Sequence, residues 1–249
     1  MPFLFFLLFV RSVAALKKTL TLPRVWIGDG PAAAPEPGAT AWALAPGQRR
    51  HLRTVLRRRD GDGVRVFGKA LGEWAATLEG DRLVADRETR PPVTDSTRLE
   101  LFFAPLRKKR CSLLLEKATE LGATRLAPVR TTRTEAASIA ALKAGPHAAV
   151  VEAAEQSERL DAPEVEALRP CDDLATDLPL FVCAERAGKA PHLFDAVKAA
   201  GGLGAAVLVG PEGGLAEEDL AAIARGRPDA VVCCLGDSVL RAETACWAA

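Results

Sequence analysis

The chain has 249 residues, a formal net charge of +1, 49% hydrophobic residues and 26% charged residues. These values describe an ordinary globular protein with enough chain for one large domain or two modest ones. The 6 cysteines form no C-x-x-C pair and no zinc spacing with the 3 histidines, which argues against a bound metal and for a reduced, cytoplasmic protein.

Residues 1–20 are an apolar leader or the product of a start codon assigned too early. Met1–Val10 is almost wholly apolar, and Ser12–Ala15 after Arg11 resembles a signal-peptide cleavage site. However, no positive residue precedes the apolar run, and the run is too short to span a bilayer. We therefore favour an early start codon, with the true start between Thr19 and Arg24, and expect no membrane association.

Residues 21–90 have the pattern of a small β domain. Short apolar or alternating runs are separated by clusters of Gly, Pro and Asp, which are typical of turns between strands. The runs are Arg24–Ile27, Gly63–Phe67, Glu73–Leu78 and Leu83–Ala85, and the turns are Pro31–Gly38, Asp60–Gly63 and Glu79–Asp81. A helix over His51–Arg58 interrupts the strands, whose close spacing favours a barrel or sandwich. Pro91-Pro92 marks the end of this domain.

Residues 91–249 change to alternating strands and helices. This alternation predicts an α/β domain with a parallel sheet that helices cover on both faces. The predicted strands are Leu99–Ala104, Arg125–Val129, Leu180–Ala184, Ala205–Val209 and Ala230–Leu235. The predicted helices are Cys111–Leu121, ended by Gly122, Glu135–Arg159, interrupted at Gly145-Pro146, Leu193–Ala200, and one helix after each of the last two strands.

Glycine-bearing loops follow both of the last two strands, at Gly210–Gly214 and at Gly236–Ala245. The carboxyl ends of parallel strands are where open α/β sheets bind ligands, and glycine lets the backbone approach a small molecule closely. The two loops therefore predict a cofactor cradle. The polar residues Arg241, Glu243 and Thr244 beside it indicate that a reaction takes place there.

The first crossover of this domain lacks the glycines of nucleotide-binding folds. Pro105–Lys108 follows the first strand, Gly201–Gly204 precedes its strand, and no G-x-x-x-x-G-K-[ST] motif occurs. The sequence therefore argues against dehydrogenases, Rossmann-type methyltransferases and nucleotide hydrolases.

Five motifs, in the right order along the chain, resemble one family. Gly210–Gly214, and Leu235-Gly236 with Leu240–Ala245, are similar to the SPOUT superfamily of methyltransferases. More narrowly, they resemble the RsmE-type enzymes that methylate N3 of a uridine in small-subunit (16S) ribosomal RNA. The other matches are Glu116–Ala123 with Pro128, Glu152–Ser157, and His51–Arg57 with Gly61-Asp62.

The resemblance implies a PUA-like β-barrel over residues 21–90, and over residues 91–249 an α/β SPOUT domain whose C-terminal part forms a trefoil knot. It also implies a homodimer, S-adenosylmethionine as the cofactor, and ribosomal RNA in the assembled small subunit as the substrate. The strand end at Ala184-Glu185 contributes a third cofactor element. The cofactor-binding residues that it implies are Leu208, Gly210, Glu212, Gly213, Gly214, Leu235, Gly236, Ser238 and Leu240.

Methylation at N3 of uracil requires loss of the N3 proton, which leaves negative charge on the neighbouring carbonyl oxygens. An arginine stabilises such an anion without giving up a proton of its own, and Arg241 is the candidate for this role. Glu243 either orients Arg241 or accepts the proton. Alternatively, Glu243 is a first-turn carboxylate that complements the helix dipole.

Two basic stretches are candidates for contact with RNA. Arg49–Arg59 holds arginines but no acid, and Arg107–Arg110 precedes a predicted helix. Positive charge there is unfavourable by about 0.3–1 kcal/mol per residue, so local stability does not explain it, whereas phosphate contact does. A solvated face is the alternative. The predicted RNA-binding residues are Arg53, Arg57, Arg58, Arg107, Lys108, Lys109 and Arg110.

Two further motif segments carry charged residues that have a plainer interpretation. For Glu116, Lys117 and Glu120, pairing along the helix is favoured over a role in a site. Local capping and pairing is likewise favoured for Glu155–Ser157.

The chain departs from the family pattern at Ser238, where a basic residue is usual, and at Ala216, where a serine or threonine usually caps the following helix. Alanine at this cap should cost roughly 0.5–2 kcal/mol. The chain also ends at Ala249, earlier than the family does. Two alternatives stay open: a SPOUT methyltransferase that acts on a ribose 2′-hydroxyl, and a catalytically degenerate RNA-binding relative.

Overall fold

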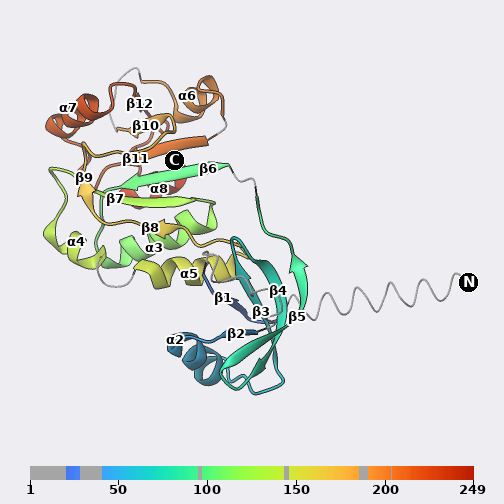
Figure 1. Cartoon of the computed structure of the whole chain (residues 1–249). Helices are drawn as coiled ribbons and strands as arrows, with labels where there is room; N and C mark the ends of the chain where they lie inside the picture. The colour runs from blue at the N-terminus through green and yellow to red at the C-terminus, as the bar shows by residue number, and fades with distance from the viewer. Residues whose placement is uncertain (1–20, 29–40, 95–96, 143–145, 185–189, 203) are drawn as a thin grey trace, which may run out of the picture. The chain divides into compact units, whose positions relative to one another are not determined.

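The computed structural model describes residues 21–28, 41–94, 97–142, 146–184, 190–202 and 204–249 (Figure 1). The chain divides into two compact units. Unit 1 is Met1–Thr94 together with Glu158–Ala162, and unit 2 is Asp95–Ser157 together with Pro163–Ala249. The predicted leader at 1–20, the turn at 31–38, Gly145 and Glu185 lie outside the described residues.

Unit 1 is built on a five-stranded sheet in the order β1-β3-β4-β5-β2. Its strands are β1 (Arg24–Trp26), β2 (Ala41–Ala43), β3 (Gly63–Gly68), β4 (Gly72–Glu79) and β5 (Arg82–Arg90). The β3–β4, β4–β5 and β2–β5 pairs are antiparallel, and β1 pairs with β3 in parallel. Two register shifts between β4 and β5 add local twist, so the sheet curls around a core that includes Leu52, Val64 and Leu83.

The helical segment of unit 1 differs in its bounds from the predicted His51–Arg58. It begins as α2 (Pro46–Arg50) and continues as the π-type turn η2 (His51–Val55). Proline favours the first helical position, and the Gln48 side chain accepts a hydrogen bond from the Ala45 amide at 2.8 Å. Both features place the start of the helix earlier in the chain than predicted. Arg57 has φ 53°, a conformation that cannot continue a right-handed helix.

A buried ionic cluster in unit 1 centres on Glu73, which is 1% exposed. Arg24 Nε lies 2.8 Å from one carboxylate oxygen and Arg65 Nη1 lies 3.5 Å from the other. Arg65 Nη2 also donates to Glu158 at 2.9 Å, and Arg24 Nη2 donates to the Arg159 carbonyl oxygen at 2.6 Å. These bonds explain why Glu158–Ala162 belongs to unit 1, which the sequence did not predict.

Unit 2 is built on a parallel sheet, as the alternation of strands and helices predicted. Its order is β12-β10-β11-β6-β7-β8, and β9 pairs with β7. The strands are β6 (Arg98–Phe103), β7 (Arg125–Arg130), β8 (Glu164–Val165), β9 (Arg169–Pro170), β10 (Leu180–Cys183), β11 (Gly204–Val209) and β12 (Val231–Cys233). The short β8 and β9 escaped prediction because neither is an apolar run.

Helices cover both faces of this sheet: α6 and α7 lie on one face, and α3, α5 and α8 lie on the other (Figure 1). The helices are α3 (Lys108–Glu120), α4 (Ala136–Leu142), α5 (Pro146–Gln156), α6 (Leu193–Ala199), α7 (Glu217–Gly226) and α8 (Ala242–Ala248). Gly122, with φ 105°, follows the end of α3 as predicted. The helix predicted to reach Arg159 instead ends at Gln156, because Glu158 has φ 59°.

The central strands of unit 2 are buried from both sides. Phe102, Leu180 and Leu208 have no exposed surface, and Ile223 of α7 packs against the same core. Such continuous apolar strands are typical of a parallel sheet between two helical layers. Within the described part of the chain, none of the helices has the length and apolar character needed to cross a bilayer.

Replacement of Glu73 by alanine is expected to destabilise unit 1 by about 3–5 kcal/mol, because Arg24 and Arg65 would stay buried without their shared carboxylate. Asp81→Ala, which breaks the exposed Arg49–Asp81 pair, should cost less than about 1 kcal/mol. Urea unfolding followed by tryptophan fluorescence measures both changes. Equal losses in the two variants would contradict the role of the cluster.

Candidate active site

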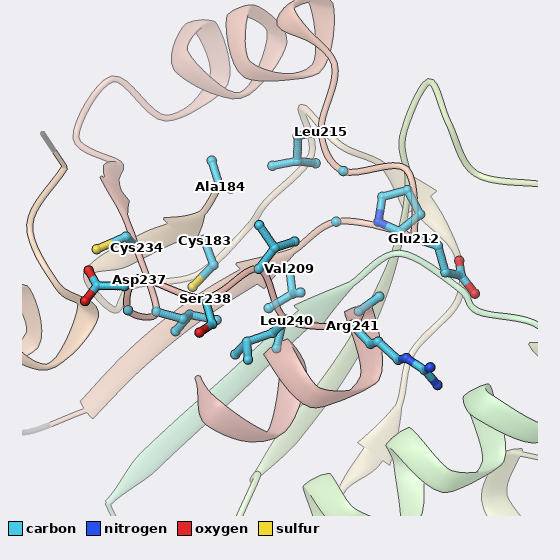
Figure 2. A pocket seen from close by; sticks show the side chains of 18 of the residues that line it. Cys183, Ala184, Val209, Glu212, Leu215, Cys234, Asp237, Ser238, Leu240 and Arg241 are labelled. Carbon is cyan, nitrogen blue, oxygen red and sulfur yellow. The ribbon is translucent and has the colours of Figure 1, made fainter. Parts of the chain in front are cut away.

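A cavity of about 740 Å³ lies at the carboxyl edge of the parallel sheet in unit 2 (Figure 2). Because β10, β11 and β12 run in the same direction, the loops that follow them meet at this edge. Cys183 ends β10 and Ala184 follows it, the Gly210–Leu215 segment follows β11, and the Cys234–Leu240 segment follows β12. The volume and the mixed apolar and polar lining suit a small-molecule ligand.

The first glycine loop is close-packed, which explains its composition. A Cβ atom at Gly210 would lie 3.0 Å from Leu215 Cγ, and one at Gly213 would lie 3.2 Å from Arg133 Cδ. Gly214 has φ 71°, a backbone conformation that other residues rarely adopt. Glycine therefore allows this loop to fold back beside the cavity.

Asp219 fixes the far end of the first glycine loop. Its carboxylate accepts hydrogen bonds from the Ala216 amide at 2.9 Å and from the Thr132 amide and hydroxyl at 2.8 Å each. Ala216 is the N-cap of α7, as predicted, and Asp219 satisfies its amide from within the helix. Burial acts to raise the pKa of Asp219, but these hydrogen bonds outweigh it and hold the pKa below its usual range.

Arg133 and Arg110 hold the middle of the same loop. Arg133 donates to the carbonyl oxygen of Gly213. Arg110 Nη1 donates to Glu212 at 3.3 Å, and Arg110 Nε lies 3.6 Å from Glu243 Oε1. The loop is therefore held by side chains from α3, from the segment after β7 and from α7.

The second glycine loop turns at Gly236, which has φ 120°, and leads into α8 with Arg241 as its N-cap residue. Figure 2 shows the charged ends of Arg241 and Glu212 on one side of the cavity, with Asp237 and Cys234 on the other. Arg241 is exposed, whereas Glu243 is 8% exposed and its Oε2 has no hydrogen-bond partner within the described part of the chain.

The structure brings most of the predicted cofactor-binding and catalytic residues to one cavity. Leu208, Gly213 and Glu243 do not line it, and Leu208 instead packs in the hydrophobic core. The predicted residues that line it are Gly210, Glu212, Gly214, Leu235, Gly236, Ser238, Leu240 and Arg241.

Several lining residues were not predicted, among them Cys183, Cys234 and Asp237. Burial, together with the neighbouring Cys233 and Cys234, raises the pKa of Cys183 to about 12. Its thiol therefore stays protonated at neutral pH and is not a nucleophile. A cysteine at the end of an apolar strand has the sequence signature of a core residue, so no pattern distinguished it. No cluster of His, Cys, Asp and Glu suited to a metal occurs among the described residues.

The basic residues of unit 1 have mixed surroundings. Arg53 pairs with Asp60 and donates to the Gly80 carbonyl oxygen at 2.7 Å, so it stabilises a turn. Arg57 is exposed, and Arg58 is partly buried. The apparent excess of positive charge in this segment is thus reduced by carboxylates outside it, Asp60 and Asp81.

The basic run of unit 2 begins at Arg107, the N-cap residue of α3, and its other three residues lie inside the helix, which begins at Lys108 rather than at the predicted Cys111. Arg107 binds Glu135 through two hydrogen bonds of 3.0 and 3.1 Å, which partly offsets the unfavourable charge at this helix end. Lys108 and Lys109 are exposed and make no contact with a carboxylate in the described part of the chain. Further along α3, Lys117 pairs with both Glu116 and Glu120, as the plainer interpretation predicted.

Known proteins match both the sequence and the fold. Residues 94–249 match the family model of the RNA methyltransferase domain. The chain is 31% identical over 202 residues to ribosomal RNA small subunit methyltransferase E of Rickettsia conorii, which covers 78% of this chain and 81% of that protein.

Solved structures show the same architecture. The crystal structure of ribosomal RNA small subunit methyltransferase E from Neisseria gonorrhoeae, bound to S-adenosyl methionine, has a TM-score of 0.70 at 25% identity and covers 91% of this chain and 94% of that one. A methyltransferase from Legionella pneumophila in complex with the same cofactor shares the fold, with a TM-score of 0.69 at 20% identity and the same coverage.

Replacement of Asp219 by alanine is expected to destabilise unit 2 by about 2–3 kcal/mol, because the amides of Ala216 and Thr132 lose a buried acceptor. Glu218→Ala, an exposed change in the same helical turn, should cost only about 0.3–1 kcal/mol.

Since the folded-state pKa of Asp219 is lowered, its contribution is present above the usual Asp range and is lost as pH falls through the lowered value. Urea unfolding of wild type and variant at pH 7 and below about pH 4 measures this. A gap between them that does not shrink at low pH would contradict the assignment.

Proposed function

The chain belongs to the RsmE type of the RNA methyltransferase family, and we propose on that basis that it methylates N3 of a specific uridine in 16S ribosomal RNA, using S-adenosylmethionine. The observation that carries the proposal is a single cavity bordered by both glycine loops and by Arg241. A ribosomal substrate also favours the cytoplasm as the site of action.

The residues around the cavity fit this cofactor. Val209, Leu215 and Leu240 offer apolar surface to an adenine ring, and the backbone of the two loops offers hydrogen-bond partners beside it. Glu212 and Asp237 offer carboxylates to hydroxyl or ammonium groups. When bound, S-adenosylmethionine supplies an electrophilic methyl group on a positively charged sulfur.

The protein must remove the N3 proton and stabilise the resulting uracil anion. We assign anion stabilisation to Arg241, because its exposed guanidinium borders the cavity and a permanent positive charge does not give up its own proton. We assign proton removal to Glu243, which does not itself line the cavity but lies two residues after Arg241 in the first turn of α8, and whose second carboxylate oxygen has no partner among the described residues. Glu243 pairs with Arg110, and no contact joins it to Arg241, which disfavours an orienting role.

RNA contact falls first to those of the predicted RNA-binding residues that have no carboxylate partner in the described part of the chain. In unit 2 these are Lys108 and Lys109 in the first turn of α3, and in unit 1 they are Arg57, which is exposed, and Arg58, which is partly buried. Arg53, Arg107 and Arg110 remain candidates, with part of their hydrogen-bonding capacity already used. Phosphate contacts of this kind bind any sequence and weaken as salt rises.

We also propose the remaining family features: a PUA-like barrel in unit 1, a trefoil knot at the C-terminus of unit 2, and a homodimer. The curled five-stranded sheet supports the barrel. The knot is supported by the path of the chain after the edge strand β12, because α8 returns to pack on β11 and α3, across the sheet from α6 and α7.

Incubation of the purified protein with radiolabelled S-adenosylmethionine and small ribosomal subunits that lack native methylation tests the proposed function. The label is expected at N3 of a uridine. Label on a ribose would agree with the fold but would show methylation of a 2′-hydroxyl instead of N3. Absence of both label and cofactor binding would indicate a catalytically degenerate relative.

The variant Arg241→Ala is expected to lower kcat about 100- to 1,000-fold, because an anion-stabilising group is lost. Its Kd for S-adenosylmethionine should stay within about threefold of wild type, since Arg241 acts on the base. Arg225→Ala, which removes an exposed arginine of α7 outside the cavity, is the matched control. Near-normal turnover of Arg241→Ala would refute the assignment.

A further inference from the structure

One side chain that lines the cavity contacts both the first glycine loop and α8. Arg110 Nη1 donates to Glu212 Oε1 at 3.3 Å, and Arg110 Nε lies 3.6 Å from Glu243 Oε1. Glu212 belongs to the glycine loop after β11, whereas Glu243 belongs to α8, which follows the loop after β12. Arg110 itself comes from α3 and lines the cavity. A single guanidinium thus joins three elements that are far apart in the sequence.

Arg110 differs in this respect from its neighbours in the basic run. Arg107 pairs with Glu135, and neither residue lines the cavity. Lys108 and Lys109 are exposed and do not line it either. The position of Arg110, rather than the overall charge of the run, therefore sets its role.

Glu243 depends on Arg110 for compensation of its charge. Its side chain is 10% exposed, and Arg110 is its sole ionic partner within the described residues. A buried carboxylate that loses its partner becomes strongly unfavourable, so α8 would shift to hydrate it. The planar guanidinium can contact two carboxylates in fixed directions, which a lysine ammonium cannot do as well.

We infer that Arg110 is a positioning residue of the cofactor cavity, which holds the first glycine loop and α8 at a fixed separation through Glu212 and Glu243. This inference rests on the proposed function, since it assumes that the cavity binds S-adenosylmethionine. It gives Arg110 a role distinct from the phosphate contact expected of the basic run as a whole.

Isothermal titration with S-adenosylmethionine tests the inference on the full chain. Arg110→Gln should raise Kd for S-adenosylmethionine by only about tenfold, because the Arg110–Glu212 pair is partly exposed and solvent screens it. It should also lower kcat, because the displaced α8 carries Glu243 and follows Arg241. Arg110→Lys should recover part of the affinity. Arg107→Gln, the matched control, should stay within about twofold of wild type.

A double variant separates positioning from direct contact. If Glu212 acts through Arg110, Arg110→Gln/Glu212→Gln should bind no more weakly than the weaker single variant. The inference would be overturned if the increases in Kd of the two single variants multiplied in the double variant. An unchanged Kd in Arg110→Gln, or an equal increase in Kd in Arg107→Gln, would overturn it as well. If Arg110→Gln fails to fold, Arg110→Lys and Glu212→Gln complete the same cycle. Failure of the wild type to bind the cofactor would refute the proposed function instead.

Discussion

The parallel direction of all strands in unit 2 is the constraint on which the candidate site depends. Because β10, β11 and β12 end at the same edge, three loops that are distant in sequence border one cavity. The strands themselves are apolar, so they contribute little chemistry. Polar function is therefore confined to the loops and to the first turns of the helices that follow them.

Loops of this kind need support, because a glycine-rich backbone has little intrinsic preference for one conformation. Here the support is electrostatic. Asp219 accepts bonds at one end of the first loop, and Arg133 and Arg110 contact its middle. Such preorganisation lowers the entropy that a ligand must remove on binding. Arg110, which the sequence alone assigned to contact with RNA, thus also stabilises the protein.

Apolar runs and glycine spacing were enough to predict the parallel sheet, the glycine loops and the edge of the sheet at which the cavity lies. The sequence could not reveal which charged side chains pair with each other. Arg107 and Arg110 look alike in the sequence, yet one pairs with Glu135 and the other joins Glu212 to Glu243. The segment Glu158–Ala162 joins unit 1 through Arg24, Arg65 and Arg90, contacts that no local pattern encodes. The pairs are long-range, whereas periodicity reports only on neighbours along the chain.

The departures at Ala216 and Ser238 supported a degenerate relative, and the structure weakens both arguments. Ala216 lacks a capping oxygen, but Asp219 bonds its amide and also reaches Thr132, so the start of α7 stays fixed. Ser238 lines the cavity and presents a hydroxyl to it. Arg241 lines the same cavity and supplies a positive charge there, although residue 238 is not basic. A degenerate site would be expected to lose a buried carboxylate with an unsatisfied oxygen first, because such a group is costly to keep without a function. This chain retains Glu243, which is 8% exposed and whose Oε2 has no partner within the described residues.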